Sequence, residues 1–245
     1  MQGRIHGRVL LLVIITLLWA DRAAAQWAGN GFLNINGGFQ PGDRSVTDTI
    51  EAPLFDETAV YDATSSSSEG TVLDASAGVR VWRGLAVGLG VTMFEVRSSM
   101  EVSGSIPSPL FVNRPRNAQF QQGGLTHRQL GIHLHMTYIF PVTDRIDVAV
   151  SAGPSLFRMR QDSPLAVALG AETAPFNTVT IASVATATAR ATGFGGNAGL
   201  DVTYMLTRFI GAGIFVRYMG GPIDFGGESV DAGGAQAGGG LRFRF

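Results

Sequence analysis

The sequence contains no cysteine, no lysine and few charged residues of either sign. Without cysteine, a disulfide scaffold, a thiolate zinc site and a cysteine nucleophile are all excluded. Charged residues make up 15% of the 245 residues, whereas about 25% is usual for a soluble domain. This difference indicates a surface that faces something less polar than water.

The basic residues are all arginine, and the formal net charge is −1. A balance this close to zero gives no sign of a nucleic-acid-binding surface. Several Gly-x-Gly pairs occur, but no helical pattern follows any of them, so they do not indicate a nucleotide-binding turn. No cofactor is predicted.

The first 25 residues have the composition of a signal peptide. Arg4 and Arg8 precede an apolar run over residues 9–20, which is too short to cross a bilayer as a helix. Three alanines at 23–25 then supply a cleavage site. We therefore predict a signal peptide at residues 1–25 and one domain at residues 26–245.

Apolar residues in that domain recur with a period of two. The even positions from Leu130 to Phe140 are all apolar or aromatic, whereas the odd positions include His133 and His135. The same alternation recurs in 145–157, 194–204 and 208–218. No stretch approaches the roughly 18 consecutive apolar residues of a membrane-spanning helix. A secreted chain with this pattern is a β-sandwich or a membrane β-barrel.

The lengths of the connections favour the barrel. We predict eight strands, at 29–39, 71–82, 85–97, 127–140, 145–159, 192–206, 208–219 and 230–245. The connections are alternately tight (83–84, 141–144, 207) and long (40–70, 98–126, 160–191, 220–229). Short turns on one side and long loops on the other are typical of outer-membrane barrels. A weaker alternation within 45–64 leaves an extra hairpin arm open.

The last strand ends in a specific motif. Leu241, Phe243 and Phe245 alternate with Arg242 and Arg244. This ending resembles the terminal signature of bacterial outer-membrane β-barrels, and the layout resembles the small-barrel group that includes OmpA-like and opacity-type domains. The resemblance implies that Leu241, Phe243 and Phe245 form an assembly signal read by the barrel-assembly machinery. The prediction is an all-β, eight-stranded antiparallel transmembrane β-barrel, monomeric, in the outer membrane of a Gram-negative bacterium and in contact with its lipid and lipopolysaccharide.

With the apolar face turned outward, a polar face lines the lumen. It comprises Asn30, Asn34, Asn36, Asp74, Ser76, Arg80, Thr92, His133, His135, Asp147, Asn197, Asp201, Arg217, Gln236, Arg242 and Arg244. Eight strands enclose a space that side chains just fill, and buried charges persist when they are paired. We therefore predict a filled lumen in which Arg80, Arg217 and Arg242 pair with Asp74, Asp147 and Asp201.

Three histidines allow sharper hypotheses. His133 and His135 lie on one face of a strand, about 6.6 Å apart, and imidazole binds zinc and copper well; hydrogen-bonded interior histidines are the alternative. His127 lies near the loop end of its strand, where it is the best-placed general base for a lipid A-modifying enzyme. The histidine-x-serine pattern of the deacylases is missing, because Arg128 and Gln129 follow His127.

The predicted function is non-enzymatic, in envelope integrity or in surface binding through the extracellular loops. A narrow porin and a lipid A-modifying enzyme are the alternatives. The most informative loop carries the apolar residues Leu110 to Val112 beside Arg114 and Arg116. We expect the apolar residues to fold over the barrel mouth or to bind a partner, and the two arginines are candidates to contact lipopolysaccharide phosphates.

Overall fold

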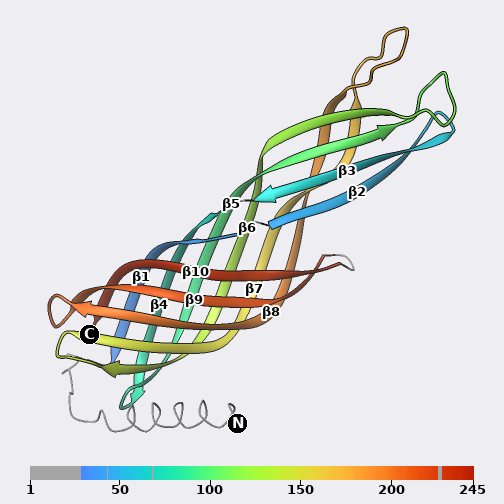
Figure 1. Ribbon diagram of the computed structural model, residues 1–245. Helices are drawn as coiled ribbons and strands as arrows, with labels where there is room; N and C mark the ends of the chain where they lie inside the picture. The colour runs from blue at the N-terminus through green and yellow to red at the C-terminus, as the bar shows by residue number, and fades with distance from the viewer. Residues whose placement is uncertain (1–28, 43, 68, 226–227) are drawn as a thin grey trace, which may run out of the picture.

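The computed structural model describes residues 29–42, 44–67, 69–225 and 228–245, which form ten antiparallel strands (Figure 1). The strands are β1 Gly31–Gln40, β2 Arg44–Leu54, β3 Glu57–Ser67, β4 Gly70–Trp82, β5 Leu85–Ile106, β6 Arg116–Pro141, β7 Ile146–Leu169, β8 Ile181–Met205, β9 Ile210–Phe225 and β10 Glu228–Arg244. The predicted signal peptide lies outside the described residues. Within the described part of the chain, no helix has the length and apolarity to cross a membrane.

Eight of the strands close into a ring. The pairing runs β4-β1-β10-β9-β8-β7-β6, and β5 pairs with both β6 and β4 to complete the circle. Closure leaves no free edge within the ring, so each strand there pairs with a neighbour on both sides, as a structure inside a bilayer requires. The predicted eight-stranded antiparallel barrel is confirmed.

The remaining strands, β2 and β3, form the hairpin arm that the alternation within 45–64 left open. Ala52 lies opposite Ala59, and β3 then pairs with the upper part of β5, from Val60 opposite Ser105 to Ser67 opposite Ser98. The hairpin thus extends one sheet beyond the ring, giving the local strand order β2-β3-β5-β6.

The prediction of long loops at 98–126 and 160–191 is wrong. β5 continues to Ile106 and pairs with β6 as far as Arg116, and β7 pairs with β8 as far as Leu169 opposite Ile181. A transmembrane strand needs only about 9–11 residues, whereas β5 to β8 have 22 to 26 residues each. The surplus residues project from one end of the ring (Figure 1).

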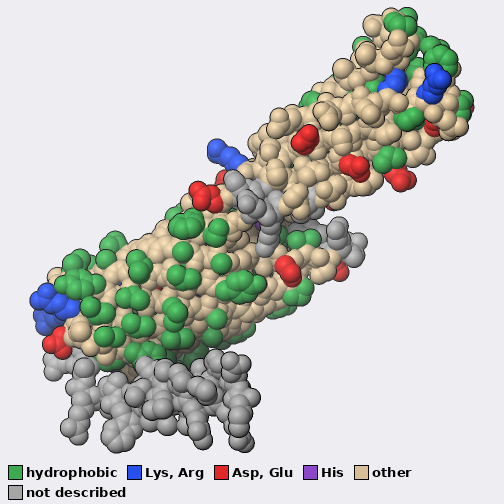
Figure 2. Space-filling view, viewed as in Figure 1, with side chains coloured by type: hydrophobic (Ala, Val, Ile, Leu, Met, Phe, Trp, Pro, Cys, Tyr) green, Lys and Arg blue, Asp and Glu red, His purple; other side chains and the backbone are tan. Residues whose placement is uncertain are grey.

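These projecting segments form a second, two-layered unit, which we call the distal sandwich (residues 44–67, 98–126 and 161–191). Its apolar core is built by residues of both layers: Ala59, Tyr61, Ala63, Met100, Val102, Ile106, Ala118, Leu125, Val179, Ile181 and Val184. All of these side chains are buried. Because the apolar residues face inward here and outward on the ring, the surface changes from apolar over the ring to mainly polar over the sandwich (Figure 2).

The wall of the ring is apolar on its outer side. On β6 the outward residues Leu130, Ile132, Leu134, Met136, Tyr138 and Phe140 form one column. The ten steps from Leu130 to Phe140, at about 3.3 Å each, cover about 33 Å along the strand, or about 25 Å along the membrane normal at a tilt of about 40°. That height matches the apolar band of outer-membrane barrels.

Candidate functional site: the barrel lumen

The middle of the lumen is crossed by a buried network centred on Arg217 of β9. Its Nη1 donates to Asp74 Oδ2 of β4 at 3.0 Å, and its Nη2 donates to Thr92 Oγ1 of β5 and to Gln236 Oε1 of β10, each at 3.0 Å. Asp74 also accepts hydrogen bonds from Thr92 at 2.9 Å and from Asn36 at 2.8 Å. The side chains of Arg217 and Asp74 are 7% and 4% exposed, so both charges are compensated inside the protein.

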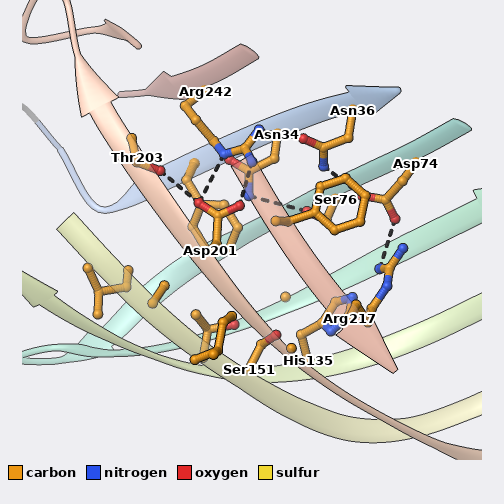
Figure 3. A pocket seen from close by; sticks show the side chains of 18 of the residues that line it. Asn34, Asn36, Asp74, Ser76, His135, Ser151, Asp201, Thr203, Arg217 and Arg242 are labelled. Carbon is orange, nitrogen blue, oxygen red and sulfur yellow. Dashed lines mark hydrogen bonds and ion pairs between the residues drawn. The ribbon is translucent and has the colours of Figure 1, made fainter. Parts of the chain in front are cut away.

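A second layer of charge lies nearer the short turns. Arg242 of β10 forms an ion pair with Asp201 of β8, and its Nη1 also donates to Asn36 Oδ1 of β1. Arg244 forms an ion pair with Asp147 of β7. Figure 3 shows Arg242 with Asp201 and Arg217 with Asp74 converging on the same space from different strands. The two layers tie together strands that are not neighbours in the ring.

The structure places the predicted lumen charges as follows. It brings Arg217 to Asp74 and Arg242 to Asp201. Asp147 forms an ion pair with Arg244, a partner that the sequence prediction did not name. Arg80 lies at the short-turn end, where its Nη1 donates to the carbonyl of Arg83 at 3.5 Å.

The two predicted histidine ligands lie in the lumen with their rings 5.6 Å apart. His133 shares hydrogen bonds with Ser155 Oγ at 2.8 Å and with Thr92 Oγ1 at 3.1 Å, so both of its ring nitrogens have partners. Among the described residues, no group of three or more His, Asp or Glu side chains is placed to hold a metal ion. The pair therefore has no third protein ligand in the part of the chain that the structure describes.

The contact between Ser155 and His133 has the distance expected of a nucleophile and its base. Both side chains are buried, and the His133 ring also packs edge-on against Phe157 at a centroid distance of 6.1 Å. On the side of the distal sandwich an apolar cluster follows, formed by Phe157, Met159, Met219, Ile223 and Ala232. A substrate that entered from the side of the distal sandwich would have to pass this cluster.

The remaining histidine hypothesis concerns His127. Its ring is half-buried at the barrel mouth, 6.1 Å from the ring of Phe94 in an edge-on contact. It lines a cavity of about 80 Å³ together with Gln129 and Gln161. His127 therefore packs against Phe94 at the barrel mouth, beside two glutamine side chains.

A cavity of about 100 Å³ remains in the lumen on the short-turn side of Arg217. It is lined by both charge layers and by apolar side chains such as Phe32, Ile139 and Phe215. At roughly 10–15 Å³ of such volume per water, it has room for several water molecules. The lumen therefore combines ion pairs, a small polar cavity and an apolar layer.

Sequence reasoning missed parts of this network. Thr92, Gln236 and Arg244 were placed on the inward face but were given no role. Gln40 Oε1, which accepts a hydrogen bond from Gln236 at 2.9 Å, lies one residue beyond the predicted end of its strand. The period-two pattern was the available signal, since it places every one of these side chains inward.

The apolar loop does not fold over the barrel mouth. Leu110, Phe111 and Val112 lie in the connection between β5 and β6 at the far end of the distal sandwich, where they are 58%, 54% and 77% exposed. Arg116 is not free to meet lipid phosphate, because it forms an ion pair with Glu172 at 2.7 Å and donates to the carbonyl of Pro107 at 2.8 Å. It ties the two tip loops together.

The predicted assembly signal lies on β10 and just after it. Leu241 and Phe245 are exposed on the outer face, and Phe243 is half-buried. The backbone of Phe245 exchanges two hydrogen bonds with Gly31, at 2.7 and 3.0 Å. These bonds continue the β1–β10 pairing to the last residue of the sequence.

No protein-family model matches the chain, and no curated protein matches its sequence. Among solved structures, it is similar to the outer membrane protein OprG from Pseudomonas aeruginosa, with 16% identity and a TM-score of 0.43, over 89% of this chain and 96% of that one. It is also similar to Neisserial surface protein A, with 14% identity and a TM-score of 0.45, over 89% and 98%. The outer membrane protease OmpT from Escherichia coli has 9% identity and a TM-score of 0.33, over 89% and 94%.

The character of the molecule follows from its own geometry. The ring of strands is closed, a band of its outer wall is apolar, and Arg217, Arg242 and Arg244 are paired with acids in its lumen. In water an apolar surface of this extent would promote aggregation, whereas a bilayer requires an apolar outer wall. The geometry is that of a small membrane-spanning β-barrel of the outer-membrane type.

Proposed function

We propose that the barrel is a closed, non-enzymatic membrane anchor that presents the distal sandwich outside the cell for surface binding. In outer-membrane barrels the short turns face the periplasm and the long connections face outward. By this rule the distal sandwich is extracellular. The proposal rests chiefly on one observation: the sandwich has its own apolar core, which includes Tyr61, Met100 and Ile106.

A packed core makes the projection a rigid structure. Flexible loops above a barrel lose conformational entropy when they bind a partner, whereas a preorganised surface avoids much of that cost. Apart from β2 and β3, the strands of the sandwich are direct continuations of β5 to β8, so the barrel wall fixes the position of the sandwich. Such a structure holds its tip at a constant distance from the membrane.

The tip has the chemistry of a contact surface. Leu110, Phe111 and Val112 are exposed side by side, and neighbouring exposed apolar side chains on a polar unit mark interaction sites. The loop that carries them is fastened by the Arg116–Glu172 ion pair. We infer that these three side chains make the main contact with another surface.

The tip is tested by adhesion. Cells that display the wild-type protein are expected to adhere to polystyrene and to one another more than cells with an empty vector. The variant Leu110→Ser/Phe111→Ser/Val112→Ser is expected to lose most of this gain at equal surface level. Val142→Ser, which changes an exposed apolar residue at the short-turn end, is the matched control and should adhere like wild type. Equal adhesion of wild type and vector would contradict the proposal.

A narrow porin is the second candidate, because the lumen holds a polar cavity of about 100 Å³. The closed anchor predicts no stable conductance in planar bilayers, since the network of Arg217 and the cluster around Phe157 lie in the path. A steady, salt-dependent current from the purified wild-type protein would favour the porin instead.

A further inference from the structure

We propose that the outer wall of the barrel carries a binding site for the phosphate groups of a phosphorylated glycolipid of the outer leaflet, of the lipid A type. The site is a row of exposed arginines that we call the arginine belt: Arg97, Arg128, Arg158, Arg160 and Arg190. The inference is independent of the surface-binding function and needs only the orientation of the barrel.

The belt lies where the apolar band ends. On β6, Arg128 directly precedes the outward column that begins at Leu130, and on β7 Arg158 and Arg160 follow the outward Leu156. Arg97 and Arg190 hold the corresponding positions on β5 and β8. The belt therefore spans four consecutive strands at the level where lipid headgroups meet the acyl chains.

The register brings like charges together. Arg128 lies directly opposite Arg160, and Arg160 lies directly opposite Arg190. Like charges in directly opposed positions destabilise a sheet, so an arrangement of three in a row is costly without an anion. The ion pair of Arg128 with Glu95, at 3.0 Å, offsets one of these charges. Arg97, Arg158, Arg160 and Arg190 make no side-chain hydrogen bond or ion pair with another described residue.

Two grooves on the outer wall adjoin the belt. The larger has a volume of about 840 Å³, and Leu73, Met93 and Leu130 line it together with Arg97, Arg128, Arg158 and Arg160; Glu69 and Glu95 also line it. The smaller has a volume of about 450 Å³, and Ile132 and Leu156 line it with Arg190. Leu130 and Arg158 belong to both grooves. Apolar side chains beneath a row of guanidinium groups suit acyl chains beneath a phosphorylated headgroup.

Exposed arginines outnumber exposed acids on the belt side of the ring, where Glu69 and Glu95 are the acids that line the larger groove. At the same end of the barrel, β9 and β10 carry the exposed acids Asp224 and Asp231, whereas the belt occupies β5 to β8. An anionic headgroup is therefore drawn to one side of the barrel. Guanidinium groups bind phosphate through paired, charge-assisted hydrogen bonds. A soluble phosphorylated partner would not use the apolar grooves, which favours a lipid.

The experiment compares binding of two probes, bis-phosphorylated lipid A and its dephosphorylated form, to the full-length protein refolded in detergent. Native mass spectrometry gives the relative affinities. We expect wild type to prefer the phosphorylated form and Arg158→Gln/Arg160→Gln/Arg190→Gln to lose about tenfold or more of its affinity, as expected when charged hydrogen bonds are removed. Arg160→Lys should lose less, because it keeps the charge but not the paired donors.

The control is Arg83→Gln/Arg145→Gln/Arg208→Gln, which removes the same number of exposed arginines at the short-turn end and should leave lipid A binding unchanged. The heat-dependent gel shift of a closed barrel verifies that each variant is folded. Three outcomes would overturn the proposal: equal binding of both lipid A forms, equal loss in the control, or displacement of lipid A by an equal concentration of inorganic phosphate, which would indicate an anion site without lipid specificity.

Discussion

Arg217 of β9 and Asp74 of β4 form an ion pair at 3.0 Å through the lumen, although β10 and β1 separate their strands in the ring. The pair therefore braces the barrel from inside. The contribution of the pair to stability depends on its burial. Removing one partner leaves the other charge without compensation in a poorly solvated space. The side chains in the lumen therefore contribute to the stability of the ring of strands.

We predict that Arg217→Leu lowers the free energy of unfolding by about 3–5 kcal/mol, the cost of leaving Asp74 charged and unpaired. Guanidinium-induced unfolding in lipid vesicles, followed by tryptophan fluorescence, measures the change. In a wide, water-filled pore the same substitution would cost little.

Two control variants test whether the loss of stability comes from the unpaired charge of Asp74. Arg217→Leu/Asp74→Leu removes both charges and is expected to recover much of the lost stability, since apolar side chains often replace a buried pair at little cost. Arg208→Leu, at an exposed turn position, should leave the unfolding midpoint nearly unchanged. An unchanged free energy of unfolding in Arg217→Leu would contradict the filled-lumen interpretation.

The barrel itself was predictable from the sequence. Each ring strand faces lipid on one side and side chains on the other, so alternation such as Leu130 to Phe140 against His133 and His135 is strict. The same alternation predicts that Arg217, Asp74 and Arg242 point into the lumen. Because lipid requires apolar side chains on one face and the lumen accepts polar side chains on the other, the alternation in the sequence identifies these strands.

Apart from the hairpin arm within 45–64, the strands of the distal sandwich were not predicted from the sequence. Buried Met100, Val102 and Ile106 alternate with small polar residues, but serines and prolines nearby give these segments the composition of loops. The partner of Asp147 was also out of reach. Alternation tells which residues face inward, whereas the tilt of the strands decides which of them meet, and that tilt places Arg244 beside Asp147.

A second prediction concerns the space beside His133. A Cβ added at Gly131 would lie 2.6 Å from His133 Nε2, the atom that shares a hydrogen bond with Thr92. Gly131→Ala must displace the imidazole, and we expect a loss of about 1–3 kcal/mol in unfolding free energy, as for other overpacked interiors. Gly37→Ala, where a Cβ has no atom within 4 Å, is the control in the same unfolding assay. Equal stability of both variants would show that the lumen is loosely packed.

A third prediction separates the ring of Phe245 from its backbone. Deleting Phe245 removes the aromatic ring and both backbone hydrogen bonds to Gly31, whereas Phe245→Ala removes only the ring. We expect the deletion to give much less folded protein in the outer membrane, with Phe245→Ala intermediate, because the ring is the feature that resembles the assembly signal. The gel shift of unheated membrane fractions gives the folded amount. Normal levels of both variants would contradict a role for Phe245 in assembly.

The last prediction tests whether the distal sandwich is held by its own core. Met100 is fully buried between the layers of the sandwich, so Met100→Ala leaves a cavity that costs about 2–5 kcal/mol. The cost falls on the sandwich alone, since the ring is closed by strand pairs below Ser98 that the substitution does not touch. We therefore expect external protease to cut the variant's sandwich on intact cells while the ring keeps its heat-dependent gel shift. Ser103→Ala, an exposed position on the same strand, should resist protease like wild type. Simultaneous loss of the gel shift in Met100→Ala would mean that sandwich and ring unfold as one unit, and the sandwich would then not be a separately packed structure.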